Sequence, residues 1–324
     1  MSQPISADAP VTYSIVIAAY NEAEVLPMLH ERLSRVLDTL DGPAEIIITN
    51  DGSSDETLEV LRGLRAIDPR VKIVNLARNF GHELAMLAGL DHSSGEAIIP
   101  MDADLQDPPE VITALAARWR EGYEVVYAVR KSREHDNPFK RSTARAFYRL
   151  MNLCTGDGIP AEAGNFRLMS RRALNAVLTM REQHRFFRAQ AHWVGFSRSS
   201  VEFERPARYA GETKYSSLRM LRLALDGILG FSTLPLKLAS LLGFIVLMLA
   251  ILMLVAKLVM LGLGGTFSSG AVFLLVVLFL SAVQLICLGI LGEYLSRIYD
   301  EVRRRPLYVV QQTEGIETGN KVAG

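Results

Sequence analysis

Two carboxylates, Asp102 and Asp104, are separated by one residue and follow a short apolar run that ends at Met101. Such a run indicates a buried strand, and two carboxylates just past its end can converge on one cation. Mg²⁺ typically takes one or two protein carboxylates together with substrate phosphate oxygens and water. An isolated Asp-x-Asp is also common in solvated loops, so the prediction of a metal site depends on this position and on the Leu105-Gln106-Asp107-Pro108-Pro109 continuation.

Other polar groups follow apolar runs in the same way. They are Tyr20-Asn21-Glu22, Asn50-Asp51-Gly52-Ser53, Arg78-Asn79-Phe80-Gly81-His82 and Arg130. Because ligands of parallel α/β sheets bind beyond the carboxyl ends of the strands, this set predicts one binding site. The alternative is a set of ordinary solvated turns, which would not be expected to converge on carboxylates and amides.

The runs that carry these groups alternate with longer amphipathic stretches, which is typical of parallel strands joined by helical crossovers. We expect strands at 13–19, 45–49, 71–76, 97–101 and 124–129, and helices at 22–40, 55–67, 83–91 and 109–121. Further along, we expect a helix at 139–152, a turn at 156–158 and strands at 166–169 and 199–204. The predicted fold class is a doubly wound α/β, mostly parallel sheet.

Several function classes lack their signatures. The sequence contains no Gly-x-Gly-x-x-Gly after the first strand, no P-loop, no serine elbow and no metalloprotease helix motif. Its formal net charge of zero argues against a nucleic-acid partner. The two cysteines, Cys154 and Cys287, lie in segments of very different character, so no disulfide is expected.

Two apolar runs without a charged residue, 238–256 and 271–291, have the length of a membrane-spanning helix. Basic residues flank both runs and the connecting turn near 262–270 carries no charge, so the positive-inside rule predicts that both ends are cytoplasmic. The amphipathic stretch 215–231 predicts an interfacial helix; a surface helix packed on the domain is the alternative.

The predicted organisation is a tail at 1–10, a cytoplasmic catalytic domain at 11–212, a juxtamembrane amphipathic helix at 213–233, two transmembrane helices within 234–295 and a cytoplasmic C-terminal tail at 296–324. No secretory signal is expected, because the apolar stretch 11–19 is short and follows Asp8 rather than a basic cluster.

Four stretches together resemble a known family. They are Ile15-Val16-Ile17-Ala18-Ala19-Tyr20-Asn21-Glu22, Asn50-Asp51-Gly52-Ser53-Ser54-Asp55, Asp102-Ala103-Asp104-Leu105-Gln106-Asp107-Pro108-Pro109 and Gly164-Asn165-Phe166-Arg167-Leu168. In this order they resemble inverting family-two glycosyltransferases with a GT-A fold that use a polyprenyl-phosphate acceptor, such as dolichol-phosphate mannose synthase. The two apolar runs make the resemblance to bacterial undecaprenyl-phosphate glucosyltransferases closer.

The resemblance implies roles for matching positions. Tyr20, Glu22 and Asp51 are expected to hold the nucleotide, and Asp102, Asp104 and Gln106 to bind Mg²⁺ or Mn²⁺ against its diphosphate. The family also implies that four basic residues act on the lipid phosphate: Arg130, Arg141, Arg208 and Lys214. For each of the four, a solvated surface charge is the alternative.

Asn165 departs from the family pattern, because many relatives have an aspartate there that has been considered as a catalytic base. Asparagine cannot serve as a base. A phosphate monoester acceptor with a second pKa near 6 is already largely ionised at neutral pH, so it can attack the anomeric carbon directly. We therefore expect Asp102, Asp104 and the basic residues to do the catalytic work, with Asn165 and Arg167 positioning the nucleotide sugar. Ala18 stands where proline is common, a change expected to affect loop stiffness alone.

The expected function is inverting transfer of a hexose from a nucleotide sugar, UDP-glucose first, to undecaprenyl phosphate at the bacterial inner membrane, in cell-envelope glycan modification. A mannosyl or aminoarabinosyl donor is the alternative. A processive synthase is disfavoured, since Gln190-Ala191-His192-Trp193 matches its Gln-x-x-Arg-Trp motif in part and more membrane helices would be needed. A non-catalytic nucleotide-binding membrane module is a third possibility. The sequence leaves the oligomeric state open, a homo-oligomer included.

Overall fold

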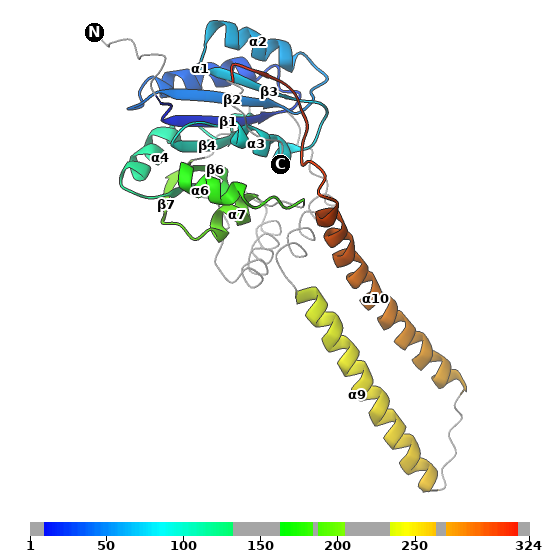
Figure 1. The fold of residues 1–324 in the computed structure, drawn as a ribbon. Coiled ribbons are helices and arrows are strands. Elements are labelled where there is room, and N and C mark those ends of the chain that lie inside the picture. Colours follow the sequence, from blue (N-terminus) through cyan, green and yellow to red (C-terminus); the bar gives the residue numbers. More distant parts are fainter. Residues whose placement is uncertain (1–9, 132–162, 184–186, 205–233, 264–269, 317–324) are drawn as a thin grey trace. The chain divides into compact units, whose positions relative to one another are not determined.

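A computed structural model describes residues 10–131, 163–183, 187–204, 234–263 and 270–316 (Figure 1). By their internal contacts the described residues divide into an α/β unit, to which residues 306–316 belong, and a second unit formed by described residues between 234 and 305. Several predicted features lie outside the described residues: the helix at 139–152, the turn at 156–158, the interfacial helix at 215–231, and Cys154.

The α/β unit is built on one eight-stranded sheet of order β7-β5-β6-β4-β1-β2-β3-β8. The strands are β1 Tyr13–Ala19, β2 Ala44–Asn50, β3 Val71–Leu76, β4 Ala97–Asp102, β5 Val125–Arg130, β6 Ala163–Ser170, β7 Arg198–Phe203 and β8 Val310–Glu314. Strand β1 pairs in parallel with β2 and β4, β2 with β3, and β5 with β7. Strands β6 and β8 are the antiparallel members. The predicted mostly parallel sheet is therefore confirmed.

Helices cover both faces of the sheet, as expected for a doubly wound fold. They are α1 Leu26–Leu37, α2 Thr57–Ile67, α3 His82–Asp91, α4 Val111–Arg120, α6 Arg171–Leu178 and α7 Phe187–Trp193. Alternate residues of β1 serve the two faces: Ile15 and Ile17 pack with α1, α2 and α4, whereas Val16 packs with α3, α6 and α7. Both sets are almost fully buried.

Some element boundaries differ from the prediction. Helix α1 begins at Leu26 rather than at residue 22, with Pro27 in its first turn. The backbone N–H of Glu22 donates instead to the Thr57 hydroxyl, 3.0 Å away. Helices α6 and α7 were not predicted, although Ser170 caps α6 by accepting a hydrogen bond from the Ala173 N–H.

The most consequential difference is β8, which lies in the segment predicted as a tail. It runs antiparallel to β3 and closes that edge of the sheet. The pairing contains a bulge: Asn75 pairs with Gln312 and Leu76 with Val310, so that Gln311 is the extra residue. Bulges change the direction in which a side chain points, and Gln311 becomes important below.

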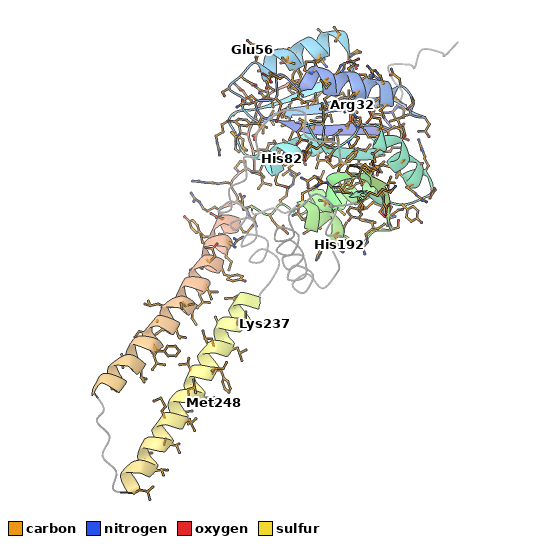
Figure 2. The ribbon with its side chains drawn as sticks, turned by 180° about the vertical axis from the view of Figure 1, so that it is seen from behind. Arg32, Glu56, His82, His192, Lys237 and Met248 are labelled. Atoms are coloured by element: carbon orange, nitrogen blue, oxygen red, sulfur yellow. The ribbon has the colours of Figure 1, made fainter. Side chains whose placement is uncertain are left out.

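The second unit contains two long apolar helices, α9 Leu234–Gly262 and α10 Gly270–Arg303. Both contain a segment long and apolar enough to cross a membrane by length and composition, Leu236–Met253 and Phe279–Arg303. Their apolar side chains, including Met248 of α9, project outward (Figure 2). Helix α10 continues past residue 295, where the second transmembrane helix was predicted to end, and finishes at Arg303. The next residue, Arg304, has a φ of 47°, outside the helical region, and Pro306 cannot continue a helix.

Candidate active site

The ends of β1, β2 and β4 lie beside one another because their registers match. Ala18 of β1 pairs with Asp102 of β4, and Ala19 pairs with Asn50 of β2. The loops that follow β1, β2 and β3, with Ala85 of α3, line a cavity of about 190 Å³. Its polar lining comes from Tyr20, Glu22, Asp51, Asn79, Gly81 and His82. Three residues predicted to hold a nucleotide, Tyr20, Glu22 and Asp51, are thus brought together.

Asp51 holds the loop after β3 in place. Its two carboxylate oxygens accept hydrogen bonds from the N–H groups of Phe80 and Gly81, at 2.7 and 2.9 Å. Burial raises the pKa of this carboxyl above its usual value, against the lowering effect of the two N–H groups and of the nearby His82 and Arg78 charges. The carboxylate therefore fixes one wall of the cavity.

Gly52, which follows Asp51, is required by the close approach of two loops. Its φ of +64° lies in the left-handed region, and a Cβ at this position would lie 2.5 Å from the carbonyl carbon of Arg78. Real Cβ atoms do not come so near another atom, so any larger residue would push the β2 and β3 loops apart.

The loop that starts at Asp102 exposes alternate residues. Ala103, Leu105 and Asp107 are buried. The three predicted metal ligands, Asp102, Asp104 and Gln106, are each partly exposed, so this one loop leaves all three accessible to solvent. Leu105 has a φ of 59°, which is uncommon for a residue with a side chain. Unusual backbone geometry of this kind clusters at ligand-binding sites.

Hydrogen bonds within this loop shape it further. The Gln106 N–H donates to Asp104 Oδ1 at 3.1 Å, and the Asp102 N–H approaches Asp107 Oδ2 at 3.4 Å.

His82 joins the Asp102 loop to the strand β6. Its Nε2 lies 3.3 Å from Asp102 Oδ1 and 3.4 Å from Asn165 Nδ2. Figure 2 labels it at the start of α3. Burial lowers the pKa of His82, but the hydrogen bond to Asp102 and the charges of Asp102, Glu83 and Asp51 outweigh burial and raise it to about 9. Asn165 and Asp102 thus lie on the same atom of His82.

Arg167 lies beneath Asn165 rather than beside it. The side chain is fully buried, and its Nε and Nη2 donate to the carbonyl oxygens of Asn165 and Gly164, at 3.2 and 3.0 Å. Its guanidinium also stacks near the rings of Tyr127 and Phe187, 5.4 and 5.3 Å from their centroids. These contacts support the backbone that carries Asn165.

Arg130 ends β5 beside the same backbone. Its Nη2 is 3.8 Å from the position that a Cβ would take on Gly164. Among the predicted basic residues, it is the one that lies within the described part of the chain. Arg141, Arg208 and Lys214 lie outside the described residues.

The donor set around Asp102 can be compared with the needs of a divalent cation. Within the described residues, no three His, Cys, Asp or Glu side chains form a complete metal cluster. Asp102, Asp104 and the Gln106 side chain offer oxygen ligands, which suit Mg²⁺ or Mn²⁺ better than a soft metal. Mg²⁺ often takes its remaining ligands from substrate phosphate and water, so this incomplete set fits such a cation.

Three polar lining residues, Asn79, Gly81 and His82, were predicted only as part of a motif at the site and without a role of their own. Their motif was noted at the end of a predicted strand, and that position was the available signal. What the sequence did not indicate was that Asp51 binds the backbone of Phe80 and Gly81 and so brings His82 next to Asp102.

Comparison with known proteins identifies the family. The model for glycosyl transferase family 2 matches residues 14–178, which contain all the described site loops. The chain belongs to glycosyl transferase family 2. The glycosyltransferase YkcC of Bacillus subtilis is 44% identical over 308 residues, covering 95% of both chains. A prophage bactoprenol glucosyl transferase homolog of Escherichia coli is 38% identical over 302 residues, covering 93% of this chain and 99% of its own.

Among solved structures, a glucosyl-3-phosphoglycerate synthase from Mycobacterium tuberculosis superposes with a TM-score of 0.46 at 18% identity, covering 68% of this chain and 78% of its own. Membership of glycosyl transferase family 2 confirms the predicted family and enzyme class. This chain is a glycosyltransferase with a mostly parallel α/β catalytic fold and two C-terminal apolar helices.

Proposed function

We propose that this glycosyltransferase moves a hexose, glucose from UDP-glucose as first choice, onto a polyprenyl phosphate at a membrane. The observation that carries the proposal is the cavity formed by Tyr20, Glu22 and Asp51 next to the Asp102-Ala103-Asp104 loop. It is supported by relatives named bactoprenol glucosyl transferase, such as that of Shigella phage SfV, 38% identical over 302 residues.

The cavity has the size of one part of a nucleotide sugar. Sites for whole small ligands span about 300–1,000 Å³, whereas this cavity measures about 190 Å³. We assign it to the nucleoside, with Asp51 and Glu22 as hydrogen-bond acceptors for its N–H or O–H groups. The diphosphate and sugar then extend toward Asp102 and Asn165, which His82 connects.

Charge supports a cation at that position. Asp51, Asp102 and Asp104 are three carboxylates that a nucleoside diphosphate, itself negative, would meet on entry. We assign Asp102, Asp104 and Gln106 as the residues that hold Mg²⁺ or Mn²⁺. When bound, the cation neutralises charge on the diphosphate and favours its departure.

The reaction is a single displacement that needs no protein base. An oxygen of the lipid phosphate, already ionised, forms a bond to the anomeric carbon. The bond from that carbon to the nucleoside diphosphate breaks, the leaving group takes the electron pair, and the anomeric centre inverts. Asn165, held by the Arg167-supported backbone, orients the donor, and Arg130 donates hydrogen bonds to the acceptor phosphate. Orientation of this kind is worth several kcal/mol of the barrier, on the order of 7–11 at best.

A lipid acceptor is consistent with the C-terminal helices. The α/β unit contains residues on both sides of α9 and α10 in the chain, since β8 follows α10 and pairs with β3. Both ends of a helical pair attached to one folded unit must emerge on the same side of a bilayer. This favours two crossings, with the catalytic domain and both termini on one side, which we take to be cytoplasmic.

The decisive experiment is a transfer assay. Membranes containing the full chain are incubated with undecaprenyl phosphate and, separately, UDP-glucose, a GDP-mannose donor and an aminoarabinose donor, and the lipid product is identified by mass. A single hexose on the lipid phosphate from UDP-glucose alone supports the proposal. Product from another donor would mean that the transferred sugar is not glucose. Polymer would indicate a processive synthase, and nucleotide binding without transfer would indicate a non-catalytic module.

The roles of Arg208 and Lys214 have a separate test. Arg208→Ala and Lys214→Ala are expected to raise KM for the lipid phosphate about 10-fold or more, because a charge-assisted hydrogen bond is worth ~1.5–3 kcal/mol. The affinity for the nucleotide sugar should change little. Equal losses for both substrates would assign these residues to the donor instead.

A further inference from the structure

A line of hydrogen-bonded side chains crosses the sheet from its C-terminal strand toward the cavity. Asn75 of β3 donates through Nδ2 to Oε1 of Gln311 on β8, at 3.1 Å. The Asn50 amide of β2 donates in turn to Asn75 Oδ1, at 2.8 Å. Asn50 and Asn75 are almost fully buried, at 2% and 8% exposed, so these two amides need each other as partners.

The line continues into the loops that form the cavity. The hydroxyl and the N–H of Ser53 both donate to Asn50 Oδ1, at 2.6 and 3.2 Å. The Asn21 N–H donates to that Ser53 hydroxyl at 3.0 Å, and the Ser54 N–H donates to Asn21 Oδ1 at 2.9 Å. We call Gln311, Asn75, Asn50, Ser53 and Asn21 the amide line. Asn21 donates to Ser53 through its backbone N–H, and from Ser53 to Gln311 each side chain donates to the next, an arrangement in which hydrogen bonds strengthen one another.

The far end of the amide line determines the shape of the cavity wall. Asn21 has a φ of 56°, in the left-handed region, and its hydrogen bonds to Ser53 and Ser54 hold it there. Tyr20 and Glu22, which line the cavity, are its two neighbours in the chain. Asp51 follows Asn50 directly. The amide line therefore adjoins all three predicted nucleotide-binding residues.

The near end is fixed by the geometry of β8. The bulge at Gln311 allows this residue to reach Asn75, although Gln312 is the backbone partner of Asn75. The Ala77 N–H donates to the Val309 carbonyl at 2.9 Å. The Tyr308 hydroxyl donates to Asp91 Oδ2 at 2.6 Å, and Arg181 binds the same carboxylate through two nitrogens. These contacts dock the segment 308–311 on β3 and α3.

We propose that the segment 306–316, which follows α10, is a positioning element of the donor site, with Gln311 as its positioning residue. Through the amide line, Gln311 holds the loops 20–22 and 51–54 in the conformation that receives the nucleotide. The proposal rests on the proposed function in so far as the cavity takes a nucleotide sugar. It gives the C-terminal segment a role in donor binding, beyond that of a tail.

The direction of the amide line gives a sharp test. Gln311 acts as an acceptor toward Asn75, so Gln311→Glu keeps the acceptor and should bind UDP-glucose as the wild type does. Gln311→Lys has no acceptor and should raise the donor KM and Kd about 3- to 10-fold, the effect of one lost hydrogen bond. Gln312→Lys is the matched control, since it places the same charge one residue further along the same exposed strand. KM for the lipid phosphate should stay constant in all three variants.

Amide hydrogen exchange of the full-length protein without nucleotide provides a readout independent of activity. Gln311→Lys should speed exchange at residues 20–23 and 52–54, whereas Gln311→Glu and Gln312→Lys should not. Unchanged exchange there, or an equal change in donor and acceptor KM, would overturn the proposal, as would equal effects of Gln311→Lys and Gln312→Lys. If wild-type protein fails to bind UDP-glucose, the choice of donor is wrong, and the exchange data alone decide whether Gln311 holds the loops.

Discussion

The two sides of the candidate site are built differently. On the side of β1, β2 and β3, the loops are joined by bonds such as Ser53 Oγ to Asn50 Oδ1 at 2.6 Å and Phe80 N to Asp51 Oδ1 at 2.7 Å. On the side of β4 and β6, the contacts of His82 with Asp102 and Asn165 measure 3.3 and 3.4 Å.

This difference indicates two ways of binding one donor. The β1–β3 side is preformed by these bonds, so under the proposed function it would select the nucleotide with little loss of loop entropy on binding. On the β4–β6 side, the partly exposed Asp102 and Asp104 would, under the proposed function, meet a cation and a diphosphate together. Binding selectivity and catalysis are therefore expected to respond to different substitutions.

The largest effect is expected from Asp104→Asn, which breaks the β4–β6 side. Asparagine lacks the negative charge that Asp104 would offer the metal ion, so transfer should fall about 10²–10³-fold. Losses of this size follow when an enzyme loses a group that stabilises charge on the leaving group. Product formation with UDP-glucose and undecaprenyl phosphate at saturating Mn²⁺ measures it.

The control for Asp104→Asn is to show that the preformed β1–β3 side is unchanged in the variant. Nucleotide affinity measured in the absence of metal, together with the thermal unfolding midpoint, should match the wild type. Transfer at the wild-type rate under metal-buffered conditions would show that Asp104 has no metal role.

Gly52→Ala breaks the preformed side. The new Cβ would lie 2.5 Å from the Arg78 carbonyl carbon at a φ of +64°, which should cost about 1–3 kcal/mol of the free energy of unfolding. Thermal or denaturant unfolding of the purified full chain measures the loss. Gly63→Ala in α2 is the matched control, because no heavy atom lies within 4 Å of its Cβ, and alanine should stabilise the helix by about 0.5–1 kcal/mol. Equal stability of the two variants would contradict the close packing of these loops.

The strands of the sheet could be predicted closely because they are apolar, β-branched and followed by polar turns. Val71–Leu76 matches its predicted range, and β1 does as well. Strand β8 could not be predicted, since its Val310-Gln311-Gln312-Thr313-Glu314 sequence contains no run of apolar residues. It is an edge strand whose pairing with β3 joins residues more than 230 positions apart, a contact that no local pattern indicates.

For the site, residues that follow strands were predictable, and those that act through tertiary contacts were not. Tyr20, Glu22 and Asp51, each predicted from its place after a strand to belong to the binding site, line one cavity. Arg167 was expected to position the donor, and its fully buried side chain instead binds backbone carbonyls beneath Asn165. Hydropathy cannot indicate that a charged residue is buried when its partners are backbone groups and aromatic rings.

A smaller effect, on pH dependence, is expected at Asp51. Burial raises the pKa of this carboxyl, so it takes up a proton at a higher pH than an ordinary aspartate, whose pKa is about 4. Protonation weakens the hydrogen bonds that this carboxyl accepts from the N–H groups of Phe80 and Gly81. Affinity for UDP-glucose should therefore be full at neutral pH and fall on acidification before pH about 4 is reached.

The variant Asp51→Asn isolates that titration. It should bind UDP-glucose about 10-fold more weakly at neutral pH, because one charged hydrogen bond is lost. Its affinity should not fall further on acidification, because position 51 no longer carries a carboxyl. Calorimetric titrations between pH 4 and 8 compare the two proteins. Parallel curves for wild type and variant would assign the acid dependence to another group.

The smallest effect is expected from Asn165→Asp, which restores the carboxylate common among relatives. If the lipid phosphate attacks without a base, the new carboxylate should change kcat by less than about 3-fold at pH 7.5, where a phosphate monoester is already ionised. It should tighten the contact with His82, whose Nε2 lies 3.4 Å from the present amide, and so make the β4–β6 side more like the preformed one. Steady-state rates from pH 6 to 8.5 measure the effect, with Asn165→Leu as the variant that removes hydrogen bonding at similar volume. A large rise in kcat for Asn165→Asp, with a new acidic limb in its pH profile, would mean that this reaction is limited by a missing base and that orientation by Asn165 is the lesser contribution.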